Sequence, residues 1–219
     1  MKNVFLAVFI FLNFLMMAQT TVRYVALGDS YTIGTGASEK EAWPAVLTKH
    51  LKENKINIEL IANAARNGWT TENVLQHEFP VLDKSNATFV TLLIGTNDYV
   101  QGVSVQTYQK NLIKIIDHIQ AQLPDKRKLI LLTLPDYSVT PGGAKYAVGR
   151  NVSEGIKEYN KVILEEAKKR NLKTVDLFTP SKEMGKDKTL VAPDGLHPSA
   201  KGYAAWEKLI YPVALELLK

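Results

Sequence analysis

Hydrophobic positions along this chain fall into two kinds of segment, short apolar runs and longer stretches with helical spacing. Apolar runs at residues 24–27, 88–94 and 128–134 are typical of strands, and the continuous run at 88–94 indicates a central strand buried on both faces. Residues 56–62 and 174–177 predict two further strands, the first from its partial alternation.

Apolar residues with helical spacing lie between these runs. They predict amphipathic helices over residues 39–54, from 70–71 onward, over 105–119 and around 156–167, and a last helix that includes residues 203–210. Strands that alternate with helices indicate an α/β domain with a parallel sheet covered on both faces. Ligands bind such sheets beyond the carboxyl ends of the strands.

Composition limits the class of protein. The chain has 219 residues, of which 46% are hydrophobic and 22% charged, and no repeat or linker divides it, so we predict one domain over residues 19–219. The formal charge of +5 is spread along the chain and does not imply nucleic-acid binding. Cysteine is absent, which excludes disulfides, a thiol nucleophile and thiolate metal sites.

The first 18 residues have the features of a secretory signal peptide. Lys2 precedes a nearly uninterrupted apolar run over residues 4–17, and Ala18 follows it. Because this run is short for a membrane span, we expect cleavage after Ala18 and export to the periplasm or the cell exterior, with no membrane span left afterwards. Retention as an N-terminal membrane anchor is the alternative.

Side chains capable of chemistry follow the predicted strands. The first strand ends at Gly28, and Asp29 and Ser30 come next. By itself this tripeptide is ordinary turn chemistry, since glycine relaxes φ and the two polar side chains bond the local backbone. A serine hydroxyl becomes an effective nucleophile only with a base, a group that orients the base and donors for an oxyanion.

Candidates for those partners lie in three other loops. Asp194 precedes His197 by three residues, a spacing that suits an aspartate orienting an imidazole. Gly68 and Asn97 each follow a predicted strand, as Ser30 does. The carboxyl ends of parallel strands share one edge of the sheet, so we expect these residues to lie together.

Four ordered blocks of this sequence resemble those of the SGNH hydrolases, also called the GDSL esterases and lipases. The blocks are Gly28-Asp29-Ser30, the loop around Gly68, Gly95-Thr96-Asn97-Asp98 and Asp194-Gly195-Leu196-His197. The resemblance covers nearly all of the chain after Val22. It implies a flavodoxin-like three-layer sandwich with a five-stranded parallel sheet, and serine ester hydrolysis without a metal or another cofactor.

Residue by residue, the resemblance implies a role for each block. Ser30 would be the nucleophile, His197 the base and Asp194 the residue that orients the histidine. The backbone N–H groups of Ser30 and Gly68 and the carboxamide of Asn97 would bind the oxyanion. A carboxamide can donate a hydrogen bond without bringing charge, and a neutral imidazole can take a proton near neutral pH.

The aspartates leave other interpretations open. Asp29, Asp98 and Asp194 resemble ligands of a two-metal phosphoesterase, but only one histidine, His197, lies in a suitable loop. We instead expect Asp29 and Asp98 to hold their loops by accepting hydrogen bonds from backbone amides. A ligand-binding module without catalysis and a flavin-binding protein are alternatives from other classes.

Residues 136–153 have no clear period, and loops of this length are commonly functional or mobile. If this segment folds over the crevice, its apolar residues would suit a short to medium acyl chain, as in an esterase, lipase or lysophospholipase. The residues concerned are Tyr137, Val139, Tyr146 and Val148. The resemblance implies a small-molecule or lipid ester as substrate, with a carbohydrate acetylesterase and an acyl thioesterase as alternatives.

Overall fold

The computed structural model describes residues 20–147 and 149–219. The predicted signal peptide and Val148 lie outside the described residues, so the structure does not test either prediction. In the described ranges, no helix combines the length and the apolar character that a membrane crossing requires.

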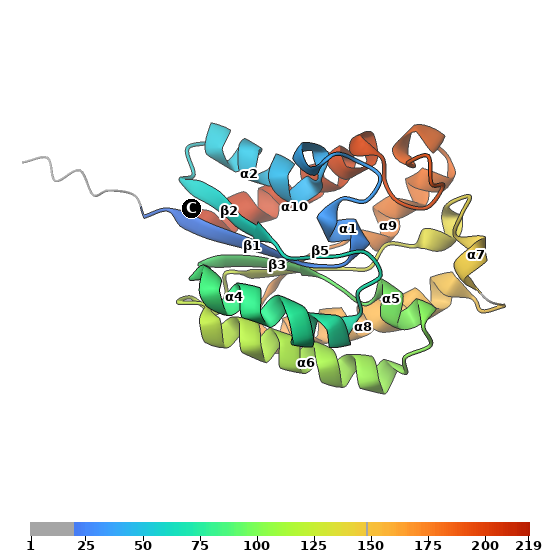
Figure 1. Ribbon diagram of the computed structural model, residues 1–219, viewed down its shortest axis with the longest axis horizontal. Helices are drawn as coiled ribbons and strands as arrows, with labels where there is room; N and C mark the ends of the chain where they lie inside the picture. Colours follow the sequence, from blue (N-terminus) through green and yellow to red (C-terminus); the bar gives the residue numbers. More distant parts are fainter. Residues whose placement is uncertain (1–19, 148) are drawn as a thin grey trace, which may run out of the picture.

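A five-stranded sheet lies between two layers of helices (Figure 1). The strands run in the order β2-β1-β3-β4-β5, and every neighbouring pair is parallel. This is the flavodoxin-like order, so the predicted fold is confirmed. The strands are β1 (Val22–Gly28), β2 (Ile58–Asn63), β3 (Phe89–Leu93), β4 (Leu129–Leu132) and β5 (Lys173–Val175).

The long helices divide between the two faces of the sheet (Figure 1). One face is covered by α2 (Trp43–Glu53) and α10 (Ala200–Leu218), and the other by α4 (Phe79–Ser85), α6 (Val105–Gln122) and α8 (Val152–Arg170). The short helices are α1 (Ser30–Ile33), α3 (Thr71–Asn73), α5 (Thr96–Val100), α7 (Ala144–Ala147) and α9 (Phe178–Ser181). The 3-10 turns are η1 (Glu39–Glu41), η3 (Tyr137–Val139), η4 (Lys182–Gly185) and η5 (Lys188–Leu190), and η2 (Val74–Glu78) is a π-helical turn.

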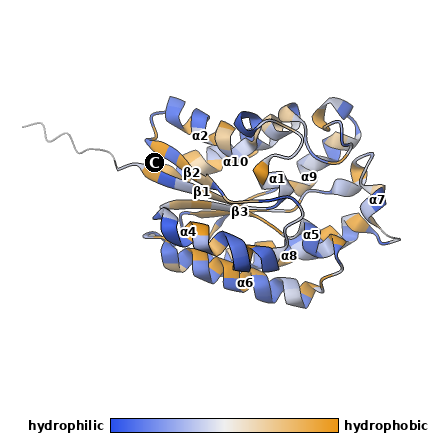
Figure 2. Cartoon of the chain, in the orientation of Figure 1, coloured by the Kyte–Doolittle hydropathy of each residue, from blue (hydrophilic) through white to orange (hydrophobic). Residues whose placement is uncertain are grey.

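The core follows the predicted pattern. Every residue of β3 and β4 is buried, which agrees with strands that are covered on both faces. Helix α6 buries the apolar positions that its sequence spacing singled out, among them Tyr108, Leu112 and Ile119. Figure 2 shows the hydrophobic central strands and the mixed polar and apolar surfaces of the helices around them. Burial of these apolar side chains therefore holds the helix layers against the sheet.

Element boundaries differ from the sequence pattern at both ends of the chain. The helix predicted over 39–54 is the turn η1 followed by α2, with Pro44 in the first turn of α2, where its missing N–H does no harm. The last helix continues past Pro212 to Leu218. Residues 136–153 contain η3, α7 and the start of α8.

The carboxyl ends of the strands lie at the right of Figure 1, beside α1, α5 and α7. Strand β1 leads into α1, the loop after β2 contains Gly68, and β3 leads through Gly95 into α5. The segment after β4 carries α7 to the same edge. The blocks singled out in the sequence therefore meet at this edge.

Candidate active site

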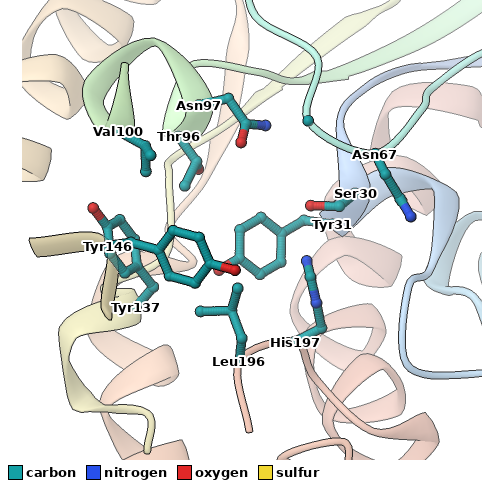
Figure 3. A pocket seen from close by; sticks show the side chains of 11 residues that line it. Ser30, Tyr31, Asn67, Thr96, Asn97, Val100, Tyr137, Tyr146, Leu196 and His197 are labelled. Carbon is teal, nitrogen blue, oxygen red and sulfur yellow. The ribbon is translucent and has the colours of Figure 1, made fainter. Parts of the chain in front are cut away.

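A cavity of about 210 Å³ lies at this edge of the sheet. Its lining residues come from loops that are far apart in the sequence: Ser30, Tyr31, Asn67, Gly68, Thr96, Asn97, Val100, Tyr137, Tyr146, Leu196 and His197 (Figure 3). The structure thus brings together Ser30, Gly68, Asn97 and His197 in one cavity, with two tyrosines of the 136–153 segment.

Ser30 is held at the junction of β1 and α1. Gly28 ends the strand with φ +151°, and a Cβ there would lie 2.3 Å from the Leu93 carbonyl oxygen, so only glycine fits. Asp29 caps α1 by accepting a hydrogen bond from the Tyr31 N–H at 3.0 Å. Ser30 is the first residue of α1, is buried, and directs its hydroxyl into the cavity (Figure 3).

Asp29 is fully buried beneath the serine. Burial raises the pKa of its carboxyl to about 8, and the charge of Asp98 acts in the same direction, while the hydrogen bond from Tyr31 opposes the shift. At neutral pH this side chain therefore holds a proton, and it stabilises the loop as a hydrogen-bonding group more than as an anion.

Two residues that line the cavity have backbone N–H groups without an acceptor. In the described residues neither the Ser30 N–H nor the Gly68 N–H donates a hydrogen bond. Gly68 has φ +77°, a conformation that favours glycine. Both groups are therefore available to an anionic oxygen in the cavity.

The carboxamide of Asn97 is already engaged. Its Nδ2 donates to the Trp69 carbonyl oxygen at 2.9 Å and lies 3.4 Å from Asp29 Oδ2. The first bond fixes the side chain against the loop that contains Gly68. The second contact is long for a hydrogen bond, so that N–H can turn toward a ligand at little cost.

Asp98 accepts hydrogen bonds from both the backbone N–H and the hydroxyl of Thr71. Burial raises the pKa of this carboxyl, and the bonds from Thr71 oppose the rise. Asp29 and Asp98 thus each accept a hydrogen bond from a backbone amide, that of Tyr31 and that of Thr71. Across residues 20–147 and 149–219, no three histidine, cysteine, aspartate or glutamate side chains are grouped to hold a metal ion.

Asp194 and His197 face each other across one turn. Asp194 Oδ2 lies 2.7 Å from His197 Nδ1, and Oδ1 accepts the backbone N–H groups of Leu196 and His197 at 2.8 Å and 3.0 Å. Partial burial raises the pKa of the Asp194 carboxyl, but these hydrogen bonds outweigh it and hold that pKa below its ordinary value. Asp194 is therefore ionised at neutral pH and can orient the imidazole.

The His197 ring lies beside Tyr31, and both residues line the cavity. Its centroid lies 5.3 Å from that of Tyr31, and its upper edge points toward Ser30 (Figure 3). In the described part of the chain, Ser30 Oγ forms no hydrogen bond to His197 or to any other group. Hydrogen bonds of this kind are often long before substrate binds.

The 136–153 segment contributes only part of the predicted pocket. Tyr137 and Tyr146 line the cavity, whereas Val139 lies elsewhere and packs beside Gly185, where an added Cβ would be 3.1 Å from the Val139 Cβ. The cause is the 3-10 turn η3, because residues two apart in such a turn point to different sides. Val148 is outside the described residues.

Five lining residues are not predicted from the sequence. They are Tyr31, Asn67, Thr96, Val100 and Leu196. Four of them are next to a predicted site residue in the sequence, and this position is the sequence signal that points to them. Val100 follows Thr96 by one helical turn on α5, and only the helix itself reveals it.

Comparison with known proteins gives a family match over most of the chain. Residues 26–205 match the model of the GDSL-like lipase/acylhydrolase family. A multidomain esterase of Ruminococcus flavefaciens is 24% identical, and the match covers 86% of this chain and 28% of that protein. An arylesterase of Vibrio mimicus is 29% identical over 47% of this chain and 51% of its own length. The chain thus spans about half or less of these two relatives.

The fold also agrees with solved structures. The crystal structure of a lipase/acylhydrolase from Enterococcus faecalis superposes with a TM-score of 0.70 at 26% identity, covering 90% of this chain and 97% of that one. Fold, ordered sequence blocks and family match therefore point the same way. The chain belongs to the GDSL-like lipase/acylhydrolase family.

Proposed function

We propose that this chain hydrolyses carboxylic esters through an acyl-enzyme on Ser30, with His197 as general base and Asp194 orienting the imidazole. The observation that carries the proposal is the 2.7 Å contact between Asp194 Oδ2 and His197 Nδ1, because His197 and Ser30 line the same cavity. Family membership and the esterases among the relatives support the same reaction class.

In the acylation step, Ser30 Oγ attacks the ester carbonyl carbon and its proton passes to His197 Nε2. Asp194 accepts the Nδ1–H of the same ring, which leaves Nε2 free to take that proton. The imidazolium then protonates the leaving alcohol. A water molecule, deprotonated by His197, attacks the acyl-enzyme, and the imidazolium returns the proton to Ser30 Oγ as the acid leaves.

The carbonyl oxygen gains negative charge in each attack. We propose that the N–H groups of Ser30 and Gly68 and one N–H of Asn97 bind this oxygen. The two free backbone donors support the assignment. The bond from Asn97 to Trp69 keeps the carboxamide in place while its second N–H leaves the long contact with Asp29.

The cavity favours a small acyl group. Its volume of about 210 Å³ lies below the roughly 300–1,000 Å³ of pockets that enclose drug-sized ligands. Tyrosines, Val100 and Leu196 supply an apolar wall. We therefore propose short-chain esters as substrates, and this size also suits the acetyl group of an acetylated carbohydrate.

An ester panel tests both the activity and the acyl size. Purified protein should hydrolyse p-nitrophenyl acetate and butyrate, and kcat/KM should fall for acyl chains of eight or more carbons. A matched thioester and an acetylated xylan distinguish the alternatives of thioesterase and carbohydrate acetylesterase. Absence of hydrolysis on every ester would reject the proposed function.

Tyr146 provides a specific test of the acyl wall. It lines the cavity but is 42% exposed, so Tyr146→Ala should disturb the fold little while widening the cavity. We expect the variant to accept longer chains and to keep its activity on acetate. The control is Tyr211→Ala on α10, whose ring packs on His50, and it should leave the preference unchanged.

We also propose that the protein is exported after removal of residues 1–18. Lys2, the apolar run at 4–17 and Ala18 support this. The intact mass of protein recovered from its native host should correspond to a chain that begins after Ala18. A mass that includes Met1 would contradict export by cleavage and favour the anchored alternative.

A further inference from the structure

A buried carboxyl group lies behind the nucleophile strand and has no part in the reaction described above. It belongs to Glu78, the last residue of the π-helical turn η2, and its exposed fraction is 0%. The Gly28 N–H donates to both of its oxygens, at 3.0 Å to Oε2 and 3.3 Å to Oε1. A buried charged or polar group without a catalytic task needs another explanation.

The geometry of the sheet explains why Gly28 needs this partner. The Ala26 carbonyl accepts the Ala64 N–H on the β2 side of β1, and Gly28, two residues later, faces the same side. The pairing of β1 with β2 ends at Ala26 and Asn63, so no strand is left to accept the Gly28 N–H. The Glu78 carboxyl takes the place of that missing strand.

The turn that carries Glu78 also contacts the loop of Gly68. His77, the residue before it, packs on Trp69 with ring centroids 5.5 Å apart, and the Trp69 carbonyl holds Asn97. π-Turns are rare and occur often at functional sites, since the extra residue re-aims the side chains around it. Here the turn directs His77 outward to Trp69 and Glu78 inward to Gly28.

We propose that Glu78 is a positioning residue, which holds Gly28 so that the hydroxyl and the N–H of Ser30 face the substrate carbonyl. Gly28 lies two residues before Ser30, and the peptide units between them determine where the Ser30 N–H points. This inference rests on the proposed function, because it takes the Ser30 hydroxyl as the nucleophile and the Ser30 N–H as a donor to the oxyanion.

The charge environment is consistent with this role. Burial raises the pKa of Glu78 well above its ordinary range, the Asp29 carboxyl adds to the rise when it is ionised, and the Gly28 N–H and Arg66 oppose it. A neutral carboxylic acid still accepts an N–H through its carbonyl oxygen. Glutamine should therefore replace Glu78 in this role, and an apolar side chain of similar length should not.

Three variants separate positioning from packing. Glu78→Met keeps the length and removes the acceptor, Glu78→Gln keeps the acceptor, and Glu72→Gln neutralises an exposed acid of α3 as the control. For Glu78→Met we expect kcat to fall about 10- to 100-fold with KM within about threefold, because a small displacement of the nucleophile is costly. Its melting temperature should fall, because the buried Gly28 N–H is left without an acceptor, whereas that of Glu78→Gln should stay near the wild-type value. The other two variants should stay within about threefold of the wild-type kcat.

Hydrogen exchange of the Gly28 amide provides a readout that does not depend on the reaction. Exchange should be about 10- to 100-fold faster in Glu78→Met and unchanged in Glu78→Gln. If Glu78→Met keeps a normal kcat or normal exchange, or if both Glu78 variants lose kcat and melting temperature together, the inference is wrong. If the wild-type protein hydrolyses no ester, the proposed function fails, and the exchange rates still decide whether Glu78 holds Gly28.

Discussion

The two halves of the active site are held in place by different means. Ser30 and Asn97 stand at the ends of buried strands, and the side chains that fix their loops, Asp29 and Asp98, are 0% and 1% exposed. Asp194 and His197 lie on a turn held by hydrogen bonds within residues 192–197 and by one bond from outside, from the Gly142 N–H to the Gly195 carbonyl, and their side chains are 39% and 14% exposed. The first half depends on the core, and the second mainly on hydrogen bonds within its own turn.

The same chemical group behaves in opposite ways in the two halves. Burial raises the pKa of Asp29 to about 8, whereas hydrogen bonds from Leu196 and His197 hold the pKa of Asp194 below its ordinary value despite its partial burial. One aspartate is a neutral structural group at pH 7, and the other is an anion that faces an imidazole. Environment, and not residue type, therefore decides which aspartate can support a base.

This difference predicts whether a substitution in each half lowers the catalytic rate, the stability of the fold or both. Substitutions in the turn half should lower the rate and leave the fold nearly intact. Substitutions in the strand-end half should change both quantities, because the same hydrogen bonds join the site to the core. Substitutions at three residues test this contrast.

The largest effect is expected for Asp194→Asn in the turn half. Asparagine would present an N–H to His197 Nδ1 and favour the wrong imidazole tautomer, so kcat should fall about 10³- to 10⁴-fold. The free energy of unfolding should change by less than about 1 kcal/mol, since the side chain is 39% exposed. Steady-state kinetics and urea denaturation measure the two quantities. A loss of kcat below tenfold would remove Asp194 from the proposed mechanism.

Asn97 should show the mixed behaviour of the strand-end half. Asn97→Ala should lower kcat about 100- to 1,000-fold with little change in KM, because the carboxamide acts mainly on the developing oxyanion. It should also cost about 1 kcal/mol of stability, since the Trp69 carbonyl loses its donor. Asn97→Asp should be at least as damaging, because it brings negative charge to the oxyanion. A folded Asn97→Asp protein with near-normal kcat would show that Asn97 only supports its loop.

The smallest effect is a change in how stability depends on pH. The pKa of Asp29 is about 8 in the folded protein and about 3.8 in the unfolded chain, so between these values the folded state binds a proton that the unfolded state has lost. The free energy of unfolding should therefore fall as pH rises from about 4 to about 8, and the raised pKa values of Asp98 and Glu78 act in the same direction.

Asp29→Asn removes one of these titrations. Its free energy of unfolding, measured in urea at pH 5, 6, 7 and 8, should depend less steeply on pH than that of the wild type, by up to about 1.4 kcal/mol per pH unit. Asp194→Asn is the matched control, since the pKa of Asp194 is lowered and its titration lies below that range. Equal slopes for Asp29→Asn and wild type would mean that Asp29 is ionised in the folded protein.

The sequence predicts the layers and the ordered blocks well because periodicity reports burial directly. The continuous apolar run that became β3 and the spacing along α6 reflect one strong effect, removal of apolar area from water. Ser30, Gly68 and Asn97 can be placed together because each follows a strand and strand ends meet at one edge of a parallel sheet, whereas His197 is singled out by its spacing from Asp194. Those predictions need no knowledge of side-chain geometry.

Other features depend on three-dimensional detail that the pattern does not carry. By composition Val139 is a suitable pocket residue, but the 3-10 turn directs it to Gly185. Glu78 lies in a polar stretch of sequence, and only the π-turn directs it inward to Gly28. The engagement of Asn97 by Trp69 is likewise set by loop geometry. Local backbone turns decide these contacts.

Covalent labelling of the serine tests the central claim most directly. Incubation with an activated alkylphosphonate ester, which traps a nucleophilic serine, should add one phosphonyl group per chain, and peptide mass spectrometry should find it on Ser30. Loss of esterase activity should follow the labelled fraction one to one, and Ser30→Ala should neither be labelled nor hydrolyse p-nitrophenyl acetate. Full activity in protein labelled at Ser30, or loss of activity with the label on another residue, would contradict an acyl-enzyme on Ser30.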